Sequence, residues 1–472
     1  MIIAKDIINK SGVTFGTSGA RGLVVDFKHN VCAAFTHAFL DVLNNSFEFK
    51  TVALAIDNRP SSYEIAQACA AAIKQHGYEV EYYGVIPTPA LAYYAMQNDI
   101  PCVMVTGSHI PFDRNGLKFY RPDGEITKSD EIAIVNNGYV FPAINELPVL
   151  KPSSLATNTY IDRYANLFTG PVLTGKRIGI YEHSSAGRDL YTVLFKLLGA
   201  DVISLGRSDE FVPIDTEAVS EADRLQAVEW SRQYNLDAIF STDGDGDRPL
   251  VADENGEWLR GDILGLLASV QLGVEALAVP VSCNSAIELS HRFKSVVRTR
   301  IGSPYVIAKF DELSREFSSV AGFEANGGYL LATDLLMNGK NLSALPTRDA
   351  VLPALMVFVA AGSKGISNLV QSLPLRFTWS DRLKNFASDK SQSIISSALV
   401  SPNNFVHSLG LSPRTCQGID QTDGVRFILD NGDVFHLRPS GNAPELRCYT
   451  EAANESQAKG YVELILSRIE QI

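Results

Sequence analysis

The densest group of side chains that could do chemistry is an acidic loop with Asp243, Asp245 and Asp247 at every second position, followed by Arg248. Three carboxylates this close repel one another unless a hard cation lies among them. A calcium EF-hand loop is one alternative, but it needs glycine where Arg248 stands, and the preceding residues 236–240 are typical of a strand. The pattern therefore favours a Mg²⁺ site that handles phosphate over a calcium site or a solvated acidic turn.

A second group follows the apolar strand expected at residues 102–105, where Ser108 and His109 lie in the segment TGSHIP. A serine after a strand is usually a turn residue, but ligands of α/β sheets bind at the carboxyl ends of strands. Lys118, ten residues further on, could bring a cationic amine back towards this serine. The alternative for Lys118 is an ordinary surface lysine.

Two further loops combine glycine with polar groups. Residues 438–444, RPSGNAP, offer an arginine fork, a hydroxyl and backbone N–H groups, which suit a phosphate dianion, although a Pro/Gly connector has the same composition. Residues 322–328, GFEANGG, hold one acid, Glu324, and one amide, Asn326, and by themselves predict a plain loop.

The elements that must position these loops alternate between strand and helix, which predicts largely parallel or mixed α/β sheets. The expected strands of three such stretches are residues 52–56, 79–83 and 102–105; 177–181, 202–205 and 237–240; and 277–281 and 296–299. The tail differs, because an Asn-Gly turn at 431–432 predicts a hairpin of residues 425–437, followed by a strand at 446–450 and a helix at 456–469. We expect three related α/β domains, 1–150, 151–254 and 255–373, and a C-terminal α+β domain, 374–472.

Composition narrows the class of protein. The 472 residues carry 41 Lys and Arg against 53 Asp and Glu, a net charge of −12, which argues against nucleic-acid binding and against a basic membrane-surface role. Six cysteines without a C-x-x-C pair favour reduced thiols in a cytoplasmic protein. No signal peptide is visible, and the longest apolar run, residues 351–361, contains a proline and is too short to span a membrane.

Together, the four loops resemble those of the α-D-phosphohexomutase family, which comprises phosphomannomutases, phosphoglucomutases and phosphoglucosamine mutases. The family patterns T-A-S-H-N-P, D-G-D-x-D-R, G-E-x-S-G and R-P-S-G-T-E-P correspond in order to TGSHIP, DGDGDR, FEANG and RPSGNAP in this chain. The resemblance extends from residues 15–22, FGTSGARG, to residues 438–444. It implies four domains around a central cleft, each contributing one loop.

The resemblance also implies roles for individual residues. Ser108 would be the phosphoserine, and Mg²⁺ would be held by Asp243, Asp245, Asp247 and a phosphoserine oxygen. The groups expected near the transferring phosphate are Arg21, His109, Lys118 and Arg248, with Lys118 as proton shuttle. Those expected to bind substrate are Glu324 and Asn326 at sugar hydroxyls, and Arg438, Ser440, Gly441 and Asn442 at the non-reacting phosphate.

Several positions depart from the family patterns. Gly107 and Ile110 replace Ala and Asn beside the serine, Asn326 replaces the serine of the sugar loop, and Gly328 stands where several members have histidine. Asn442 and Ala443 replace Thr and Glu in the phosphate loop. The serine, the acids and the arginines remain, so the phosphate chemistry is still possible, while the sugar preference and any acid/base role of a histidine stay open.

The activity that the resemblance implies is interconversion of a hexose 6-phosphate and a hexose 1-phosphate, with a hexose 1,6-bisphosphate as intermediate and activator. Mannose phosphate is the first expectation, and glucose, glucosamine or acetylglucosamine phosphate are the alternatives. A sugar-phosphate-binding homologue without catalysis and a phosphatase are rivals from other classes. We expect a monomer or homodimer acting in carbohydrate metabolism, with a small-molecule sugar phosphate as partner.

Overall fold

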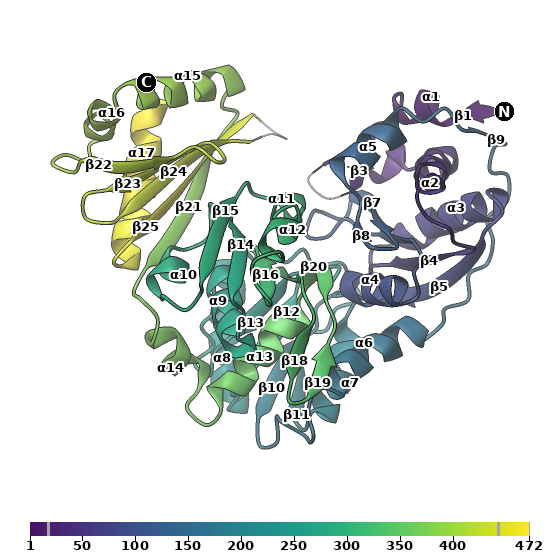
Figure 1. The fold of residues 1–472 in the computed structure, drawn as a ribbon, viewed down its shortest axis with the longest axis horizontal. Coiled ribbons are helices and arrows are strands. Elements are labelled where there is room, and N and C mark those ends of the chain that lie inside the picture. Colours follow the sequence, from purple (N-terminus) through teal and green to yellow (C-terminus); the bar gives the residue numbers. More distant parts are fainter. Residues whose placement is uncertain (17–18, 441–443, 472) are drawn as a thin grey trace. The chain divides into compact units, whose positions relative to one another are not determined.

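The computed structural model describes residues 1–16, 19–440 and 444–471. These residues form two compact units, Met1–Glu275 with Gly302–Leu369, and Ala276–Ile301 with Val370–Ile472. The ribbon in Figure 1 is coloured along the chain and carries the element labels used below.

The N-terminal part of the first unit is built on a mixed sheet. The strand order is β2 (Thr14–Phe15), β3 (Ala20–Leu23), β7 (Arg114–Arg121), β6 (Cys102–Val105), β4 (Thr51–Ile56), β5 (Glu79–Val85), with β8 (Gly124–Glu125) paired to β7. β4 runs parallel to β5 and β6, whereas β7 is antiparallel to β6 and β3. The serine loop therefore leaves the carboxyl end of a parallel strand and returns as the antiparallel strand β7.

Helices cover both faces of this sheet (Figure 1). α2 (His29–Leu43) and α3 (Ser62–Gln75) share a core with Val52, Leu54 and Ile56, while α4 (Thr88–Gln97) packs on the other face of β4. This arrangement follows from strand β4, TVALAI, whose residues after Thr51 are all buried. The smaller elements of this part are β1 (Ile2–Ile3), α1 (Ala4–Ile8), the 3₁₀ turn Val24–Asp26, α5 (Lys128–Val135) and β9 (Val140–Phe141).

The middle of the first unit carries a second sheet, in which a parallel trio ends in an antiparallel hairpin. The strand order is β11 (Asp201–Leu205), β10 (Arg177–Tyr181), β12 (Ala238–Thr242), β13 (Pro249–Ala252). The helices along this stretch of the chain are α6 (Leu155–Ala165), α7 (Arg188–Leu197), α8 (Glu221–Tyr234) and α9 (Gly261–Leu272). Thr242 pairs with Pro249, so the acidic loop is the turn of the β12–β13 hairpin.

The remaining part of the first unit holds the sugar loop between two antiparallel strands. β16 (Val320–Phe323), β17 (Tyr329–Leu331) and β20 (Leu345–Asp349) pair in that order. The other elements are α11 (Ser303–Ile307), α12 (Phe310–Leu313), the hairpin of β18 (Leu335–Met337) and β19 (Lys340–Leu342), and α13 (Val351–Ala361). α14 (Ile366–Gln371) follows.

The second unit contains an antiparallel sheet of five strands. The order is β21 (Phe377–Lys384), β25 (Glu445–Ala452), β24 (Val434–Pro439), β23 (Val425–Leu429), β22 (Cys416–Asp420). α17 (Glu455–Glu470) packs on β21 and β25, and α15 (Ser388–Val400) packs on β24 and β25. The unit also contains α16 (Pro402–Ser408), α10 (Ala286–Leu289) and the parallel pair β14 (Ala276–Pro280) and β15 (Ser295–Thr299).

The predicted fold class, mixed α/β sheets with a C-terminal α+β part, is confirmed. The hairpin expected around the Asn-Gly turn is present as β23 and β24. The four domain boundaries and the central cleft stay predictions.

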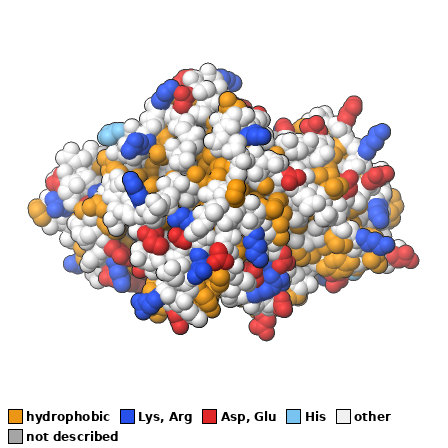
Figure 2. All heavy atoms as spheres, turned by 90° about the horizontal axis from the view of Figure 1, so that it is seen from below, with side chains coloured by type: hydrophobic (Ala, Val, Ile, Leu, Met, Phe, Trp, Pro, Cys, Tyr) orange, Lys and Arg blue, Asp and Glu red, His pale blue; other side chains and the backbone are white. Residues whose placement is uncertain are grey.

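Charged side chains of both signs occur on the face of the molecule drawn in Figure 2. On the face drawn in Figure 2, acidic and basic side chains are interspersed with apolar ones. No helix among residues 1–16, 19–440 and 444–471 combines the length and apolar character that crossing a membrane requires.

Candidate active site

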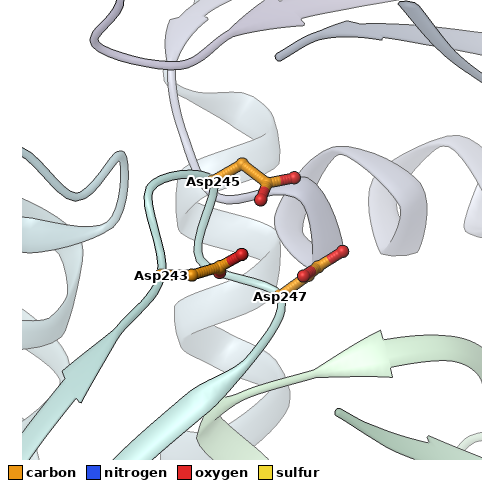
Figure 3. Close-up of side chains that lie close together, drawn as sticks. All are labelled: Asp243, Asp245 and Asp247. Atoms are coloured by element: carbon orange, nitrogen blue, oxygen red, sulfur yellow. The ribbon is translucent and has the colours of Figure 1, made fainter. Parts of the chain in front are cut away.

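The side chains of the three aspartates of the β12–β13 turn lie close together (Figure 3). Asp243, Asp245 and Asp247 are at most 1% exposed, and one carboxylate oxygen from each lies within 4.8 Å of the others. Gly246 has φ +72°, and a Cβ there would lie 2.5 Å from the hydroxyl of Tyr191. Glycine is therefore required for the turn that brings the carboxylates together.

The donor set fits a hard divalent cation. Oδ1 of Asp245 and Oδ1 of Asp247 are buried, and neither has a hydrogen-bond partner among the described residues. Burial, reinforced by the other two aspartates, raises the pKa of Asp243. Buried carboxylate oxygens without partners are costly unless a cation compensates them, and oxygen-only donors suit Mg²⁺.

Ser108 faces this acidic turn from the loop after β6. Its Oγ donates a hydrogen bond of 2.6 Å to Oδ2 of Asp243, and its backbone N–H donates to Oγ1 of Thr106 at 2.8 Å. Ser108 is fully buried and its backbone has φ +55°, a left-handed conformation that residues other than glycine rarely adopt. Such local strain is typical of residues held in place for function.

Arg59 anchors the backbone of the serine loop. Its Nη2 donates to the carbonyl oxygens of Ser108, at 2.9 Å, and of Ile110, and its Nε donates to Oδ2 of Asp57 at 3.1 Å. Its Nη1 donates to two more loop carbonyls, those of Pro111 and Arg114. Arg59 was not predicted as a site residue, because its only local signal is a turn at the start of a helix.

Lys118 is not a surface lysine. From strand β7, its Nζ donates to Oδ2 of Asp245 and to Oδ2 of Asp247, both at 2.6 Å, and the residue is only 4% exposed. Burial would lower the pKa of Lys118, but the two aspartates outweigh burial and raise it. The structure thus places a full positive charge beside the predicted metal ligands.

Two more titratable groups, His109 and Arg248, lie beside Ser108. Nη1 of Arg248 donates to Nδ1 of His109 at 3.0 Å, and that nitrogen lies 3.4 Å from Oγ of Ser108. Burial and the charge of Arg248 lower the pKa of His109 to about 4, so this histidine is neutral at pH 7. Burial and the charge of Arg248 also lower the pKa of Arg21 to about 10.

The sugar loop reaches the same region of the first unit through Arg348. Glu324 and Asn326 are 3% and 8% exposed, and Oε2 of Glu324 accepts a hydrogen bond of 2.5 Å from Nε of Arg348. Nη1 of Arg348 lies 3.7 Å from Oδ2 of Asp247. Arg348 was not predicted as a site residue, because it lies twenty-four residues beyond Glu324 and belongs to no local motif.

The predicted phosphate loop belongs to the second unit. Nε of Arg438 donates to Oδ2 of Asp423 at 2.9 Å, and the backbone N–H of Ser440 donates to the carbonyl oxygen of Glu445 at 2.9 Å. Gly441 and Asn442 lie outside the described residues. The structure thus brings together the predicted serine, metal and sugar loops, and the role of the fourth loop stays a prediction.

Comparison with known proteins identifies the family. Three models match: phosphoglucomutase/phosphomannomutase, alpha/beta/alpha domain I, at residues 12–138; domain III of the same family at residues 261–377; and its C-terminal domain at residues 397–467. The chain belongs to the phosphoglucomutase/phosphomannomutase family.

Individual relatives are similar over nearly the whole chain. A phosphomannomutase of Salmonella muenchen is 59% identical over 98% of this chain and 97% of its own length. A phosphomannomutase of Sinorhizobium fredii is 42% identical over 95% of this chain and 97% of its own length. The crystal structure of a phosphoglucomutase/phosphomannomutase family protein from Burkholderia thailandensis has a similar fold, with a TM-score of 0.74 and 17% sequence identity. The match covers 100% of this chain and 98% of that one.

Proposed function

We propose that this chain is a phosphomannomutase that carries the transferred phosphoryl group on Ser108. The observation that carries the proposal is the 2.6 Å hydrogen bond between Ser108 and Asp243, which joins a buried hydroxyl to the buried acidic turn. The two relatives of highest identity reported above, at 59% and 42%, are both named phosphomannomutase. The proposal includes a phosphoprotein acting in the cytoplasm, which the six free cysteines support.

Phosphoryl transfer depends on in-line positioning and on neutralising the charge of the phosphoryl oxygens. A hydroxyl of the hexose phosphate would attack the phosphorus of phospho-Ser108, and the bond from phosphorus to Oγ would break. The hydroxyl proton would pass to Oγ of Ser108, with Lys118 as the shuttle. Arg21 and Arg248 would stabilise the negative charge, and neutral His109 would accept a hydrogen bond from Arg248, as it does here.

Asp243, Asp245 and Asp247 would hold Mg²⁺ together with an oxygen of the phosphoserine. When bound, Mg²⁺ supplies positive charge to the transferring phosphoryl group. This role accounts for two buried aspartate oxygens that lack hydrogen-bond partners among the described residues. A solved relative in fold, an N-acetylphosphoglucosamine mutase of Aspergillus fumigatus, was determined with GlcNAc-6P and magnesium; its TM-score is 0.61 at 15% identity, covering 99% of this chain and 98% of that one.

The product of the first transfer would be a hexose 1,6-bisphosphate, which would turn over and return its other phosphate to Ser108. Glu324 and Asn326 would bind sugar hydroxyls. A single clamp of Arg438, Ser440, Gly441 and Asn442 would hold the non-reacting phosphate in both halves of the reaction. A closed cleft would exclude water, because water would otherwise hydrolyse the phosphoserine.

A substrate panel tests this proposal. Mannose, glucose, glucosamine and N-acetylglucosamine phosphates are compared by kcat/KM with Mg²⁺ and a catalytic amount of hexose 1,6-bisphosphate. We expect mannose phosphate to give the highest value. Preference for a glucosamine phosphate would move the chain to another branch of the family, and release of inorganic phosphate without isomerised sugar would indicate a phosphatase.

A further inference from the structure

We propose that Arg348 is a positioning residue of the sugar site, that Gly328 makes room for it, and that together they fix Glu324 and thereby set the sugar preference. This inference rests on the proposed function. It assigns roles to Arg348, which belongs to no sequence motif, and to Gly328, which stands where several family members have histidine.

The first observation is the contact between Arg348 and Glu324. Nε of Arg348 donates to Oε2 of Glu324 at 2.5 Å, and the two side chains are 3% and 4% exposed. A buried guanidinium–carboxylate pair is geometrically selective, because the planar donors of arginine fix the plane and direction of the acceptor. This hydrogen bond to Oε2 restrains the Glu324 carboxylate before any sugar arrives.

The second observation is that the same guanidinium reaches the predicted metal site. Nη1 of Arg348 lies 3.7 Å from Oδ2 of Asp247, which is itself 1% exposed. The arginine lies between a carboxylate of the sugar loop and a carboxylate of the acidic turn. Its position couples the place where the sugar hydroxyls are recognised to the place where the phosphoryl group is transferred.

The third observation explains why residue 328 is glycine. A Cβ built on Gly328 would lie 2.6 Å from Cδ, 2.8 Å from Cγ and 3.2 Å from Cβ of Arg348. Gly328 directly precedes β17, and Tyr329 of β17 pairs with Asp349 of β20, the residue after Arg348. The methylenes of Arg348 thus fill the space that a side chain at position 328 would need, so a histidine there and this arginine conformer exclude one another.

Sugar discrimination follows from this rigidity. A site built to hydrogen-bond a particular hydroxyl rejects an analogue whose hydroxyl is missing or misplaced, because its own buried polar group is then left unpaired. Such rejection requires that the acceptor cannot turn to follow the wrong epimer. Arg348 prevents Glu324 from turning, and without it the carboxylate could adapt to either epimer.

The test compares Arg348→Met, Arg348→Lys, Gly328→Ala and Glu324→Gln with the wild-type enzyme on mannose and glucose phosphates. We expect Arg348→Met to reduce kcat/KM for the preferred sugar by roughly 10–100-fold, chiefly through a higher KM. The ratio of kcat/KM for mannose phosphate to kcat/KM for glucose phosphate, called the sugar ratio below, should move towards one. Arg348→Lys keeps the positive charge but lacks the planar guanidinium, so its sugar ratio should lie between those of Arg348→Met and the wild type. Gly328→Ala displaces Arg348 while keeping its charge, and should compress the ratio even if Arg348→Met does not fold.

The double variant Arg348→Met/Glu324→Gln separates positioning from general damage. If Arg348 acts through Glu324, the double variant has the same sugar ratio as Glu324→Gln alone. The matched control is Arg163→Met, which removes a second buried arginine of the first unit that contacts Tyr93 and Ser343. This control should lower stability and leave the sugar ratio unchanged.

Two results overturn the inference. One is an unchanged sugar ratio in both Arg348→Met and Gly328→Ala, and the other is a double variant whose losses multiply as if the two residues were independent. A wild-type chain that isomerises none of the sugar phosphates overturns the proposed function itself, and this inference with it. The wild-type measurement therefore distinguishes the two failures.

Discussion

Oγ of Ser108 lies 2.6 Å from Oδ2 of Asp243, although the two residues are 135 positions apart in the chain. The contact joins the loop after β6 to the turn of the β12–β13 hairpin, within one compact unit. A phosphate carried on this oxygen would be next to the three aspartates. The proposed chemistry depends on this proximity.

Replacing the hydroxyl tests the role of Ser108. We expect Ser108→Ala to reduce mutase turnover by at least roughly 10³-fold, because the variant has no atom to carry the phosphoryl group. Its far-UV circular dichroism should match that of the wild type. Turnover near the wild-type value, in a coupled assay with bisphosphate activator, would show that Ser108 is not the phosphoryl carrier.

Removing one aspartate tests the metal site. Asp245→Asn should weaken Mg²⁺ binding by at least 10–100-fold, an order of magnitude taken from changes around metal sites, and should reduce Mg²⁺-dependent turnover. The measurement is activity titrated with Mg²⁺. Asp237→Asn is a suitable control, since Asp237 pairs with Lys176 and is 38% exposed, so its titration should follow that of the wild type. Equal Mg²⁺ dependence in both variants would rule out the proposed ligand set.

Arg59 should matter for both stability and catalysis. Arg59→Met leaves the buried carboxylate of Asp57 without its cationic partner and frees the carbonyl oxygens of the serine loop, which we expect to cost about 3–5 kcal/mol of unfolding free energy. Because Arg59 also holds the carbonyl oxygen of Ser108, turnover should fall as well. Urea denaturation checks the first effect and the mutase assay the second; Arg177→Met, at an exposed pair with Asp201, is the control. Wild-type stability in Arg59→Met would contradict the anchoring role.

A buried histidine of helix α2 should make stability depend on pH. His37 is fully buried, with Nε2 at 3.2 Å from Oε1 of Gln75, and burial lowers its pKa from 6.5 to about 4. Between these values the unfolded chain binds more protons than the folded chain, so stability is lost as pH falls from 6.5 towards 4.

The variant His37→Gln removes this proton linkage. Its unfolding free energy should depend less steeply on pH below 6.5, by up to about 1.4 kcal/mol per pH unit. The measurement is urea denaturation of both proteins at several pH values. Parallel curves for the two proteins would contradict the assignment of a neutral buried His37.

Local patterns predicted much of the fold. An apolar run predicted strand β4, and an Ala-rich segment predicted helix α3. The Asn431-Gly432 turn predicted the hairpin of β23 and β24. Strand β21 was not predicted, because none of its residues is buried and its burial pattern lacks a regular alternation. Long-range pairing with β25 determines that strand, and such pairing has no local signature.

The sequence predicted some residues of the candidate site and not others. The spacing of Asp243, Asp245 and Asp247 gave the metal ligands, because charge repulsion within a short loop is visible in the sequence. Arg59 and Arg348 could not be predicted, since each acts on partners more than twenty residues away that only the folded chain brings near. The explanation for Gly328 likewise required the structure, because the atoms that exclude a side chain there belong to Arg348.

Mass analysis of the peptide that contains Ser108 tests the central claim most directly. The wild-type protein is incubated with Mg²⁺ and a hexose 1,6-bisphosphate, freed of small molecules, and then chased with mannose 1-phosphate. We predict one phosphate on Ser108 before the chase and its transfer to the sugar during the chase. A peptide that never carries phosphate at Ser108, in a preparation that nevertheless turns over mannose phosphate, would contradict the account.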